Sequence, residues 1–272
     1  MSERVENKLG GDIRMIFAIS DIHGAYDLFK ERVEQLELYL EKGDKLILLG
    51  DYIDRGYDSC GCLRLAKELQ DKYGKDQIIA LKGNHEVWFL DFLVHQGDDW
   101  LAEDVRFCTS KTFLTDDEYE GLKLLGNREQ ILDYIRNTIK KSHRELLQWT
   151  SNLPLYYENA TQIFVHAGVD EDIPEEEIEY CTLATGDYIF TGKYPPTKGK
   201  FYKDIIAGHV AASEVAKDNS LQGIYFDGFS HFYIDGSANK NRRLLCLGYD
   251  EETGCYYDFG LDGSKKILKE NR

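Results

Sequence analysis

Five short apolar runs in this chain each end in a tight turn that carries polar or charged side chains. The runs with their turns are residues 16–24, 46–56, 78–86, 163–168 and 205–209. An apolar run bounded by glycine is typical of a buried strand, and open α/β sheets place their chemistry at the carboxyl ends of their strands. We therefore expect five strand ends to meet on one ridge and to form a site there.

The first hundred residues alternate between strand and helix patterns, which favours a parallel sheet covered by helices. The predicted strands are residues 13–19, 46–49 and 77–81, and the predicted helices are residues 25–41, 62–73 and 85–96. The second half contains short apolar runs separated by turns, which indicate a second, mixed sheet. These runs are residues 155–157, 161–165, 205–207, 223–226, 231–234, 244–249 and 255–259.

Two segments between these halves have a different character. Residues 97–127 are polar, with scattered aromatic side chains and weak periodicity, and we expect them to be an insertion or cap over the site. Residues 128–149 resume helical spacing and predict one long amphipathic helix. With 272 residues and 42% apolar content, the chain can bury a sizeable core, so we expect a single domain spanning 1–272.

Charge and cysteine content exclude some partners and compartments. The net charge of −16 argues against duplex nucleic acid or an anionic membrane as a partner, because phosphate binding needs clustered Lys and Arg. The six cysteines include no C-x-x-C pair, which favours buried or free thiols in a reducing compartment. Residues 1–14 are polar and no apolar run approaches membrane-spanning length, so we expect a cytoplasmic protein.

Six side chains in the turns are candidate metal ligands. Asp21 and His23 are two residues apart, and in extended backbone such side chains point the same way, so both could bind one ion. Asp51 could bridge two ions through its two oxygens. The remaining candidates are the amide oxygen of Asn84 and the imidazoles of His166 and His209. This mixed oxygen and nitrogen set predicts two divalent ions, with manganese expected before iron or zinc.

Charge balance predicts what such a pair of ions would bind. Two divalent ions bring four positive charges, and the carboxylates of Asp21 and Asp51 bring two negative ones, which leaves two positive charges. A phosphomonoester carries about −1.5 to −2 at neutral pH and nearly neutralises them. Paired metals also lower the pKa of a bridging water, so a metal-bridging hydroxide could attack the phosphorus in line.

Three further side chains are predicted to complete the chemistry. His85 follows Asn84 and can protonate the leaving group, while Asp54 can hydrogen-bond its far nitrogen and stabilise the imidazolium. Arg55 can bind phosphate oxygens through both arms of its guanidinium. We therefore expect His85, Asp54 and Arg55 to be catalytic, and Arg55, Asn84 and His85 to contact the substrate phosphate.

Three motifs together resemble a known family. They are D-x-H-G at 21–24, G-D-x-x-D-R-G at 50–56 and G-N-H-E at 83–86, followed by V-H-A-G at 165–168 and G-H at 208–209. In this order they resemble the phosphoprotein phosphatase branch of the calcineurin-like metallophosphoesterases. The resemblance implies an α/β sandwich of two mixed sheets flanked by helices. It also implies a first metal held by Asp21, His23 and Asp51, and a second held by Asp51, Asn84, His166 and His209.

The likeness is greatest to bacterial and phage serine/threonine phosphatases and to symmetrical diadenosine tetraphosphatases. We therefore expect a serine/threonine protein phosphatase, whose substrate is a phosphorylated protein or a small phosphoester, acting by direct attack of a metal-bridging hydroxide without a covalent intermediate. The alternatives are a symmetrical bis(5'-nucleosyl)-tetraphosphate hydrolase and, from a different class, a phosphate-binding module without catalysis. Retention of the acid pair His85 and Asp54 speaks against the binding module, since binding alone would not need it.

Two positions depart from the family pattern or leave it open. Members of that branch usually carry a second phosphate-binding Arg between the two late histidines, whereas this chain has no Arg from 145 to 241. Candidate replacements are Lys193, Lys198, Lys200 and Lys203. His231 is an alternative to His209 as the last ligand, although its alternating surroundings favour a strand histidine.

Overall fold

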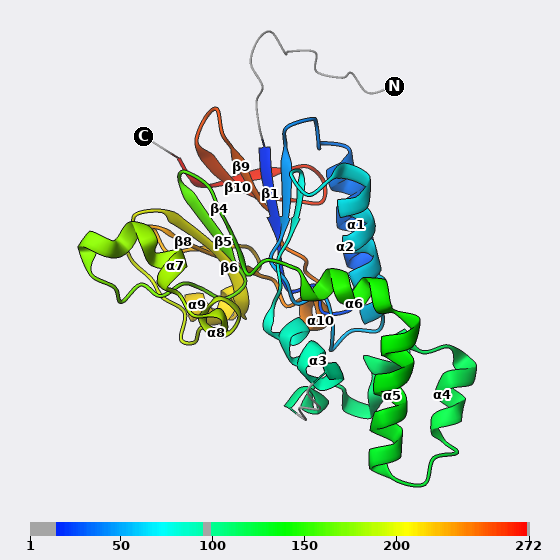
Figure 1. The fold of residues 1–272 in the computed structure, drawn as a ribbon. Coiled ribbons are helices and arrows are strands. Elements are labelled where there is room, and N and C mark those ends of the chain that lie inside the picture. The colour runs from blue at the N-terminus through cyan, green and yellow to red at the C-terminus, as the bar shows by residue number, and fades with distance from the viewer. Residues whose placement is uncertain (1–14, 95–98, 271–272) are drawn as a thin grey trace, which may run out of the picture.

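Strand β1 (Met15–Ile19) is buried on both faces, so its side chains alternate between two layers of the molecule. Phe17 and Ile19 pack against helices, while Ile16 and Ala18 face a second sheet. The computed structural model, which describes residues 15–94 and 99–270, repeats this alternation in the neighbouring strands. The result is two mixed sheets packed face to face with helices outside them (Figure 1).

The first sheet has the strand order β11-β10-β9-β1-β2-β3. Its other strands are β2 (Lys45–Leu48), β3 (Ile78–Ala80), β9 (Leu247–Asp250), β10 (Cys255–Phe259) and β11 (Lys265–Lys269). Strands β1, β2 and β3 are parallel, and β9, β10 and β11 extend the sheet in antiparallel fashion.

The second sheet has the order β4-β5-β6-β8-β7. Its strands are β4 (Tyr156–Glu158), β5 (Gln162–Val165), β6 (Asp204–Ala211), β7 (Tyr225–Phe226) and β8 (His231–Asp235). Strands β5, β6 and β8 are parallel, with the antiparallel strands β4 and β7 at the two edges. Its inner face contributes Phe164, Ile206 and Phe232 to the core between the sheets.

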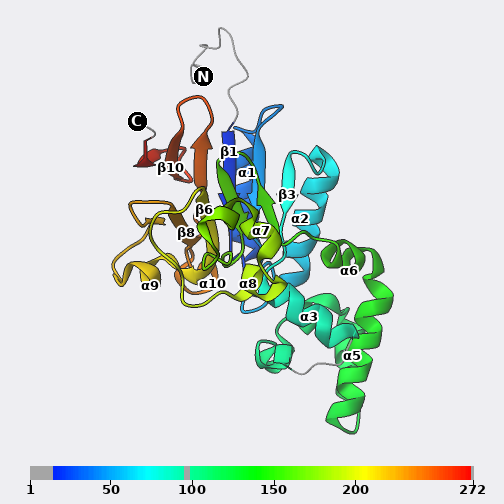
Figure 2. The ribbon, with the colours of Figure 1, turned by 60° about the vertical axis from the view of Figure 1, so that its left-hand side comes forward.

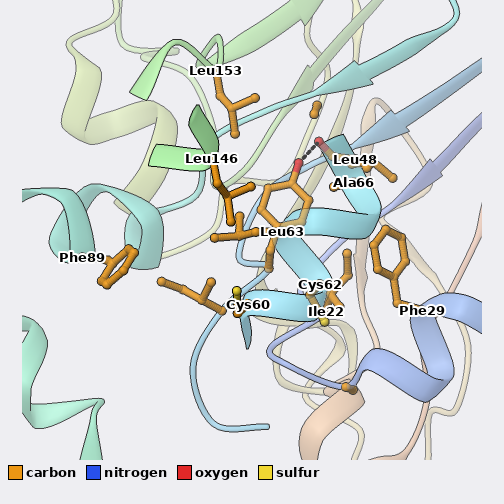
Figure 3. Close-up of a cluster of buried hydrophobic side chains, with 14 of the residues drawn as sticks. Ile22, Phe29, Leu48, Cys60, Cys62, Leu63, Ala66, Phe89, Leu146 and Leu153 are labelled. Carbon is orange, nitrogen blue, oxygen red and sulfur yellow. Dashed lines mark hydrogen bonds between the residues drawn. The ribbon is translucent and has the colours of Figure 1, made fainter. Parts of the chain in front are cut away.

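Helices cover the outer face of each sheet (Figures 1 and 2). On the first sheet, α1 (Tyr26–Glu37) and α2 (Ser59–Tyr73) bury Phe29, Leu63 and Ala66 beside Leu48 (Figure 3). On the second sheet lie α7 (Cys181–Ala184), α8 (Asp187–Gly192) and α9 (Ala212–Ala216). The short helix α10 (Ala238–Asn241) follows β8. No helix in the described part of the chain has the length and apolar character needed to cross a membrane.

In the sequence, the segment that joins β3 of the first sheet to β4 of the second sheet is mostly helical. It contains α3 (Asn84–Val94), α4 (Asp116–Leu122), α5 (Arg128–Ser142) and α6 (Arg144–Ser151). Three single-turn 3-10 helices, Asp99–Ala102, Val105–Phe107 and Ser110–Phe113, lie between α3 and α4. Helices α4 and α5 lie side by side and project from the body of the molecule (Figure 1).

The predicted class, a sandwich of two mixed sheets flanked by helices, is confirmed. The assignment of every late strand to the second sheet is wrong, because 244–249 and 255–259 supply β9 and β10 of the first sheet. There β9 pairs with β1, and Phe259 of β10 packs against Phe17 with ring centroids 5.2 Å apart. Residues 1–14 and 95–98, where the first predicted strand begins and the third predicted helix ends, lie outside the described residues.

The single long helix expected at 128–149 is also wrong. The chain leaves the helical conformation at His143, which has φ −122° and ψ 28° and separates α5 from α6. The imidazole nitrogen Nε2 of His143 lies 2.7 Å from the carbonyl oxygen of Phe113, and the two rings pack edge to face. The break between α5 and α6 is therefore anchored to Phe113 of the preceding segment. The helical spacing of the sequence did not predict this break.

Candidate metal centre

The carboxyl ends of parallel strands from both sheets meet on one side of the sandwich. In the first sheet, the turns after β1, β2 and β3 carry Asp21 and His23, Asp51, and Asn84. From the second sheet come His166, directly after β5, and His209, within β6. The structure thus brings all six predicted ligands together, and all but the half-buried His209 are buried.

Asp51 lies at the centre of this group. Its Oδ2 is 3.6 Å from Nε2 of His23 and 3.3 Å from Nε2 of His166. The same oxygen is 3.7 Å from Nε2 of His85. A carboxylate surrounded by imidazoles from three separate segments of the chain is well placed to serve two neighbouring ions.

Two overlapping sets of side chains have the geometry to hold a metal ion. One contains His23, Asp51 and His85, and the other contains Asp51, His166 and His209, with the donor atoms of each set within 4.8 Å of one another. Asn84 belongs beside the second set, since its Oδ1 lies 2.9 Å from His166 Nε2 and 3.1 Å from His209 Nδ1.

Asp21 lies between the two sets. Its Oδ1 is 3.8 Å from His23 Nε2, and its Oδ2 accepts a hydrogen bond of 3.0 Å from the backbone N–H of His209. Burial raises the pKa of Asp21, and so does the neighbouring Asp51.

Backbone carbonyls fix which imidazole nitrogen faces the centre. Nδ1 of His23 donates to the carbonyl of Ile53 at 3.0 Å, and Nδ1 of His166 donates to the carbonyl of Leu49 at 2.9 Å. With Nδ1 bound to a carbonyl, each ring turns its Nε2 toward Asp51, the orientation that metal-bound histidines take. Burial also lowers the pKa of His23 to about 3 and that of His209 to about 4, so both rings are neutral donors.

Asp51 and His166 stabilise each other's charge in the pocket. Burial opposes a charge on His166, yet Asp51 and Asp21 raise its pKa to about 9. Burial acts against ionisation of Asp51 too, but His166 and His85 hold the pKa of Asp51 well below its usual range. The donors are carboxylate oxygens, an amide oxygen and imidazole nitrogens, a set that fits two divalent transition-metal ions.

The turns that present these side chains are strained. Six residues of the site have the positive φ angles that non-glycine residues rarely adopt: Asp21, His23, Asp51, Asp54, Arg55 and His209. Such conformations persist only where the surrounding structure imposes them. The expectation that Asp21 and His23 act from extended backbone is therefore wrong, since left-handed turns bring their side chains together instead.

Close approach of backbone explains two glycines of the motifs. A Cβ at Gly83 would collide with Oδ1 of Asp51, and a Cβ at Gly208 would collide with Oδ2 of Asp21. Both positions therefore leave room for a carboxylate of the site.

Glu86 fixes the turn after β2 against the start of α3. Its Oε2 accepts hydrogen bonds of 2.9 Å from the N–H groups of Asp51 and Gly83, and its Oε1 accepts one of 2.8 Å from that of Tyr52. Burial raises the pKa of this fully buried carboxyl to about 7. Glu86 therefore anchors the backbone around Asp51.

The predicted acid pair lies beside the candidate ligands. Nδ1 of His85 is 2.6 Å from Oδ2 of Asp54, and both side chains are buried. Burial disfavours the imidazolium, but Asp51 and Asp54 together raise the pKa of His85 to about 9. Arg55 points Nη1 at Nε2 of His23 and Nη2 at Nε2 of His85, each at 3.0 Å.

His231, the alternative ligand, and three of the candidate lysines contact other groups of the protein. His231 is buried with Nε2 3.0 Å from Glu171 and Nδ1 3.1 Å from Asp227, as a strand histidine of β8. Lys193 and Lys203 pair with Glu171 and Glu158. Lys198 donates to the carbonyl of Val215. Their ammonium groups are thus held by acidic side chains or a carbonyl, so these three are poor replacements for a phosphate-binding Arg.

Four further side chains lie near the site and were not predicted from the motifs. They are Asp235, Trp100, Glu103 and Thr109. Asp235 follows the apolar run of β8 and precedes a glycine, so the pattern that identified Asp51 could have found it. Burial and the nearby Asp21 raise its pKa to about 8. The other three come from the segment of weak periodicity and carry no local signal.

Comparisons with known proteins identify the family of the chain. A family model described as calcineurin-like phosphoesterase matches residues 15–272. The chain is 40% identical over 90 residues to serine/threonine-protein phosphatase 2 of Escherichia coli (strain K12), covering 33% of the chain and 38% of that protein. It is 30% identical over 169 residues to the symmetrical bis(5'-nucleosyl)-tetraphosphatase of Nitrosospira multiformis, covering 62% of the chain and 47% of that protein.

The chain thus matches less than half of the length of these two relatives. Among solved structures, a cold-active protein-tyrosine phosphatase of a psychrophile, Shewanella sp., superposes with a TM-score of 0.59 at 15% identity. That match covers 94% of this chain and 81% of the other, and it shows a shared fold.

Proposed function

The chain belongs to the calcineurin-like phosphoesterase family, and on that premise we propose that it is a metal-dependent phosphatase of phosphoserine and phosphothreonine proteins. The family matches the one expected from the motifs. The observation that carries hydrolysis, rather than binding alone, is the His85–Asp54 pair at 2.6 Å beside the candidate ligands. Phosphate binding needs cations, whereas a buried acid pair beside them is useful for protonating a leaving group.

The proposed ligands are Asp21, His23 and Asp51 for one ion and Asp51, Asn84, His166 and His209 for the other, with manganese as the proposed metal. When bound, the two ions would supply Lewis acidity toward the phosphoryl oxygens and an activated water as nucleophile. The donor atoms are imidazole nitrogens and oxygens, and such a mixed set suits manganese, iron or zinc.

The chain's own side chains supply positioning and the proton. Arg55 points one N–H arm at the candidate ligand His23 and the other at His85, and the two arms can bind two phosphate oxygens in parallel. His85 donates its Nε2 proton to the leaving oxygen as the ester bond breaks. Asp54 accepts a hydrogen bond from Nδ1–H of His85 and stabilises the imidazolium before transfer.

A groove next to the site supports a peptide substrate. A cavity of about 710 Å³ begins at Asn84 and is lined by Trp88, Leu155 and Tyr188. Lys82 supplies a cation there, but its ammonium donates to the carbonyl of Ser151. This largely apolar wall suits the side chains that flank a phosphoresidue better than it suits a chain of phosphates.

A second candidate is hydrolysis of symmetrical dinucleoside tetraphosphates. It is favoured by the similarity to the enzyme of Nitrosospira multiformis, which extends over 62% of this chain. The exposed rings of Trp88 and Tyr188 could stack on a nucleobase. The two functions use the same proposed metals and differ in the leaving group.

The test is turnover of both substrates under one condition. Metal-stripped protein is reloaded with Mn²⁺ and assayed in parallel with a phosphothreonine peptide and with diadenosine tetraphosphate. Faster turnover of the peptide supports the phosphoprotein function. Turnover of the dinucleotide alone transfers the assignment to the second candidate, and turnover of neither contradicts both.

A further inference from the structure

One segment of the insertion, residues 99–113, reaches the turn that carries Asp54 and Arg55. Trp100 of this segment donates its indole N–H to Asp54, with Nε1 3.1 Å from Oδ1 and 3.0 Å from Oδ2. Thr109 donates its hydroxyl to Oδ1 of Asp54 at 2.6 Å. Both side chains are fully buried. Two donors from the insertion therefore meet the carboxylate that faces His85.

The segment is itself held in place. Asp104 accepts hydrogen bonds from the backbone N–H groups of Thr109 and Ser110 at 2.8 and 3.1 Å. The indole of Trp100 packs on Phe89 and Phe92 of α3, with ring centroids 4.9 and 4.8 Å apart. Since α3 begins with Asn84 and His85, the insertion connects the helix that carries the acid to the turn that carries its partner.

A third contact involves the neighbouring guanidinium. Nε of Arg55 lies 3.3 Å from Oε2 of Glu103, on the side away from the candidate ligands. Its two other nitrogens stay directed at His23 and His85. The same segment thus contacts both consecutive residues of the turn.

We propose that Trp100 and Thr109 are positioning residues for the His85–Asp54 pair, so that the insertion serves to build the general acid. The kinetic effects expected from this proposal rest on the proposed function. A buried carboxylate needs hydrogen-bond donors to remain ionised, and it accepts them through both oxygens. Thr109 donates to Oδ1, and the indole N–H of Trp100 is shared between Oδ1 and Oδ2, so the carboxylate is held with Oδ2 facing Nδ1 of His85.

This arrangement has a defined effect on the proton transfer. A bond from the attacking water oxygen to phosphorus forms as the bond to the leaving oxygen breaks; the leaving oxygen takes the proton from Nε2 of His85, and His85 becomes neutral. The hydrogen bond from Nδ1–H of His85 to Asp54 is kept throughout. If Asp54 loses its donors, its carboxylate is free to rotate, and the acid is less well oriented.

The kinetic test uses Trp100→Phe and Thr109→Val with two substrates of different leaving groups. With a phosphothreonine peptide, whose alkoxide must be protonated, we expect kcat to fall about 10- to 100-fold while KM changes little. With p-nitrophenyl phosphate, whose leaving group departs as a stable anion, we expect a clearly smaller fall. Thr109→Ser, which keeps the hydroxyl, should restore kcat for the peptide.

Matched variants elsewhere control for general loss of structure. Thr182→Val removes a similar hydroxyl bond to a carboxylate, Glu158, and Trp149→Phe removes an indole bond to Gln70. Both should leave the ratio of the two activities unchanged. Equal losses on both substrates in the Trp100 and Thr109 variants, or no loss on either, would overturn the proposal.

A second readout does not depend on turnover. In ¹⁵N-histidine-labelled protein, the Nδ1 proton of His85 should resonate far downfield and be assigned by its loss in His85→Gln. Trp100→Phe and Thr109→Val should move this resonance upfield, and an unmoved resonance contradicts the proposal. Wild-type protein that hydrolyses no phosphoester would refute the proposed function, while this spectrum would still decide the positioning role.

Discussion

At the scale of single residues, the site depends most on Asp51. One of its oxygens faces imidazoles from three separate segments of the chain, and Asp51 itself has a left-handed φ of 54°. Backbone N–H groups on either side of it are held by Glu86. The residue is therefore strained, buried and charged at once, a combination that a ligand role explains and that packing alone would not favour.

We expect Asp51→Asn to lose both metal ions and to lower hydrolysis by more than about 100-fold, because losing a ligand exceeds the effect of losing a ligand's hydrogen-bond partner. Calorimetric titration with Mn²⁺ and steady-state assays measure the two effects. Asp133→Asn, which changes an exposed carboxylate on α5, is the control and should retain both properties. Full metal binding by Asp51→Asn would show that another side chain bridges the ions.

His85→Ala should separate metal binding from turnover. We expect this variant to keep both ions and to lose about 10²- to 10⁴-fold in kcat with an alkyl phosphoester, the usual range for a general acid. An aryl phosphate is a poor test, because its leaving group departs without a proton. Wild-type rates on the alkyl substrate would remove His85 from the mechanism.

At the scale of elements, each connection between strands brings its own contribution to the site. Turns after β1, β2 and β3 supply most candidate ligands, and these could be predicted because an apolar run, a glycine and a polar side chain are adjacent in the sequence. The contacts of Trp100 and Thr109 with Asp54 could not, since they join residues 46 and 55 positions apart in a segment without periodicity. The break at His143 likewise depends on a partner 30 positions away.

Tyr188 at the start of α8 tests the groove beside Asn84. Its side chain is 77% exposed and lines the same cavity as Trp88. We expect Tyr188→Ala to raise KM for a phosphothreonine peptide by about tenfold, equivalent to about 1.4 kcal/mol. The variant should keep the wild-type kcat/KM for p-nitrophenyl phosphate. An unchanged KM for peptides that carry apolar residues on either side of the phosphothreonine would exclude this groove as a peptide site.

The ion pairs around His231 tie β8 to the loop after β5, away from the metal centre. Burial opposes both charges, yet contact with His231 and Lys193 lowers the pKa of Glu171 to about 2, while Glu171 and Asp227 raise that of His231. The contribution of Glu171 to the free energy of unfolding is present above pH 4.5 and is lost as pH falls toward 2. The contribution of His231 to the free energy of unfolding is present below pH 6.5 and is lost as pH rises through the raised pKa of His231.

We therefore expect His231→Gln to lower the free energy of unfolding most between pH 4.5 and 6.5, by about 3 kcal/mol, and less at higher pH. Urea unfolding across this range measures the effect. His143→Gln is the matched control, because burial lowers the pKa of His143 and its effect should shrink as pH falls. A destabilisation by His231→Gln that grows with pH would contradict this account of the pair.

At the scale of the whole molecule, two sheets form the site together. Both sheets turn the carboxyl ends of their parallel strands to the same side, so ligands from the first sheet meet His166 and His209 from the second. The local motifs predicted these strand ends and their residues. They could not predict that the last strands return to β1, because Phe17 pairs with Gly248 across more than 200 residues of chain.

The most direct test of the account is low-temperature EPR spectroscopy of protein loaded with two equivalents of Mn²⁺. Two ions that share Asp51 should give the spectrum of an exchange-coupled pair, and Asp51→Asn should abolish it. A spectrum of isolated Mn²⁺ ions in the wild-type protein, or a coupled spectrum that survives Asp51→Asn, would contradict a paired centre bridged by this residue.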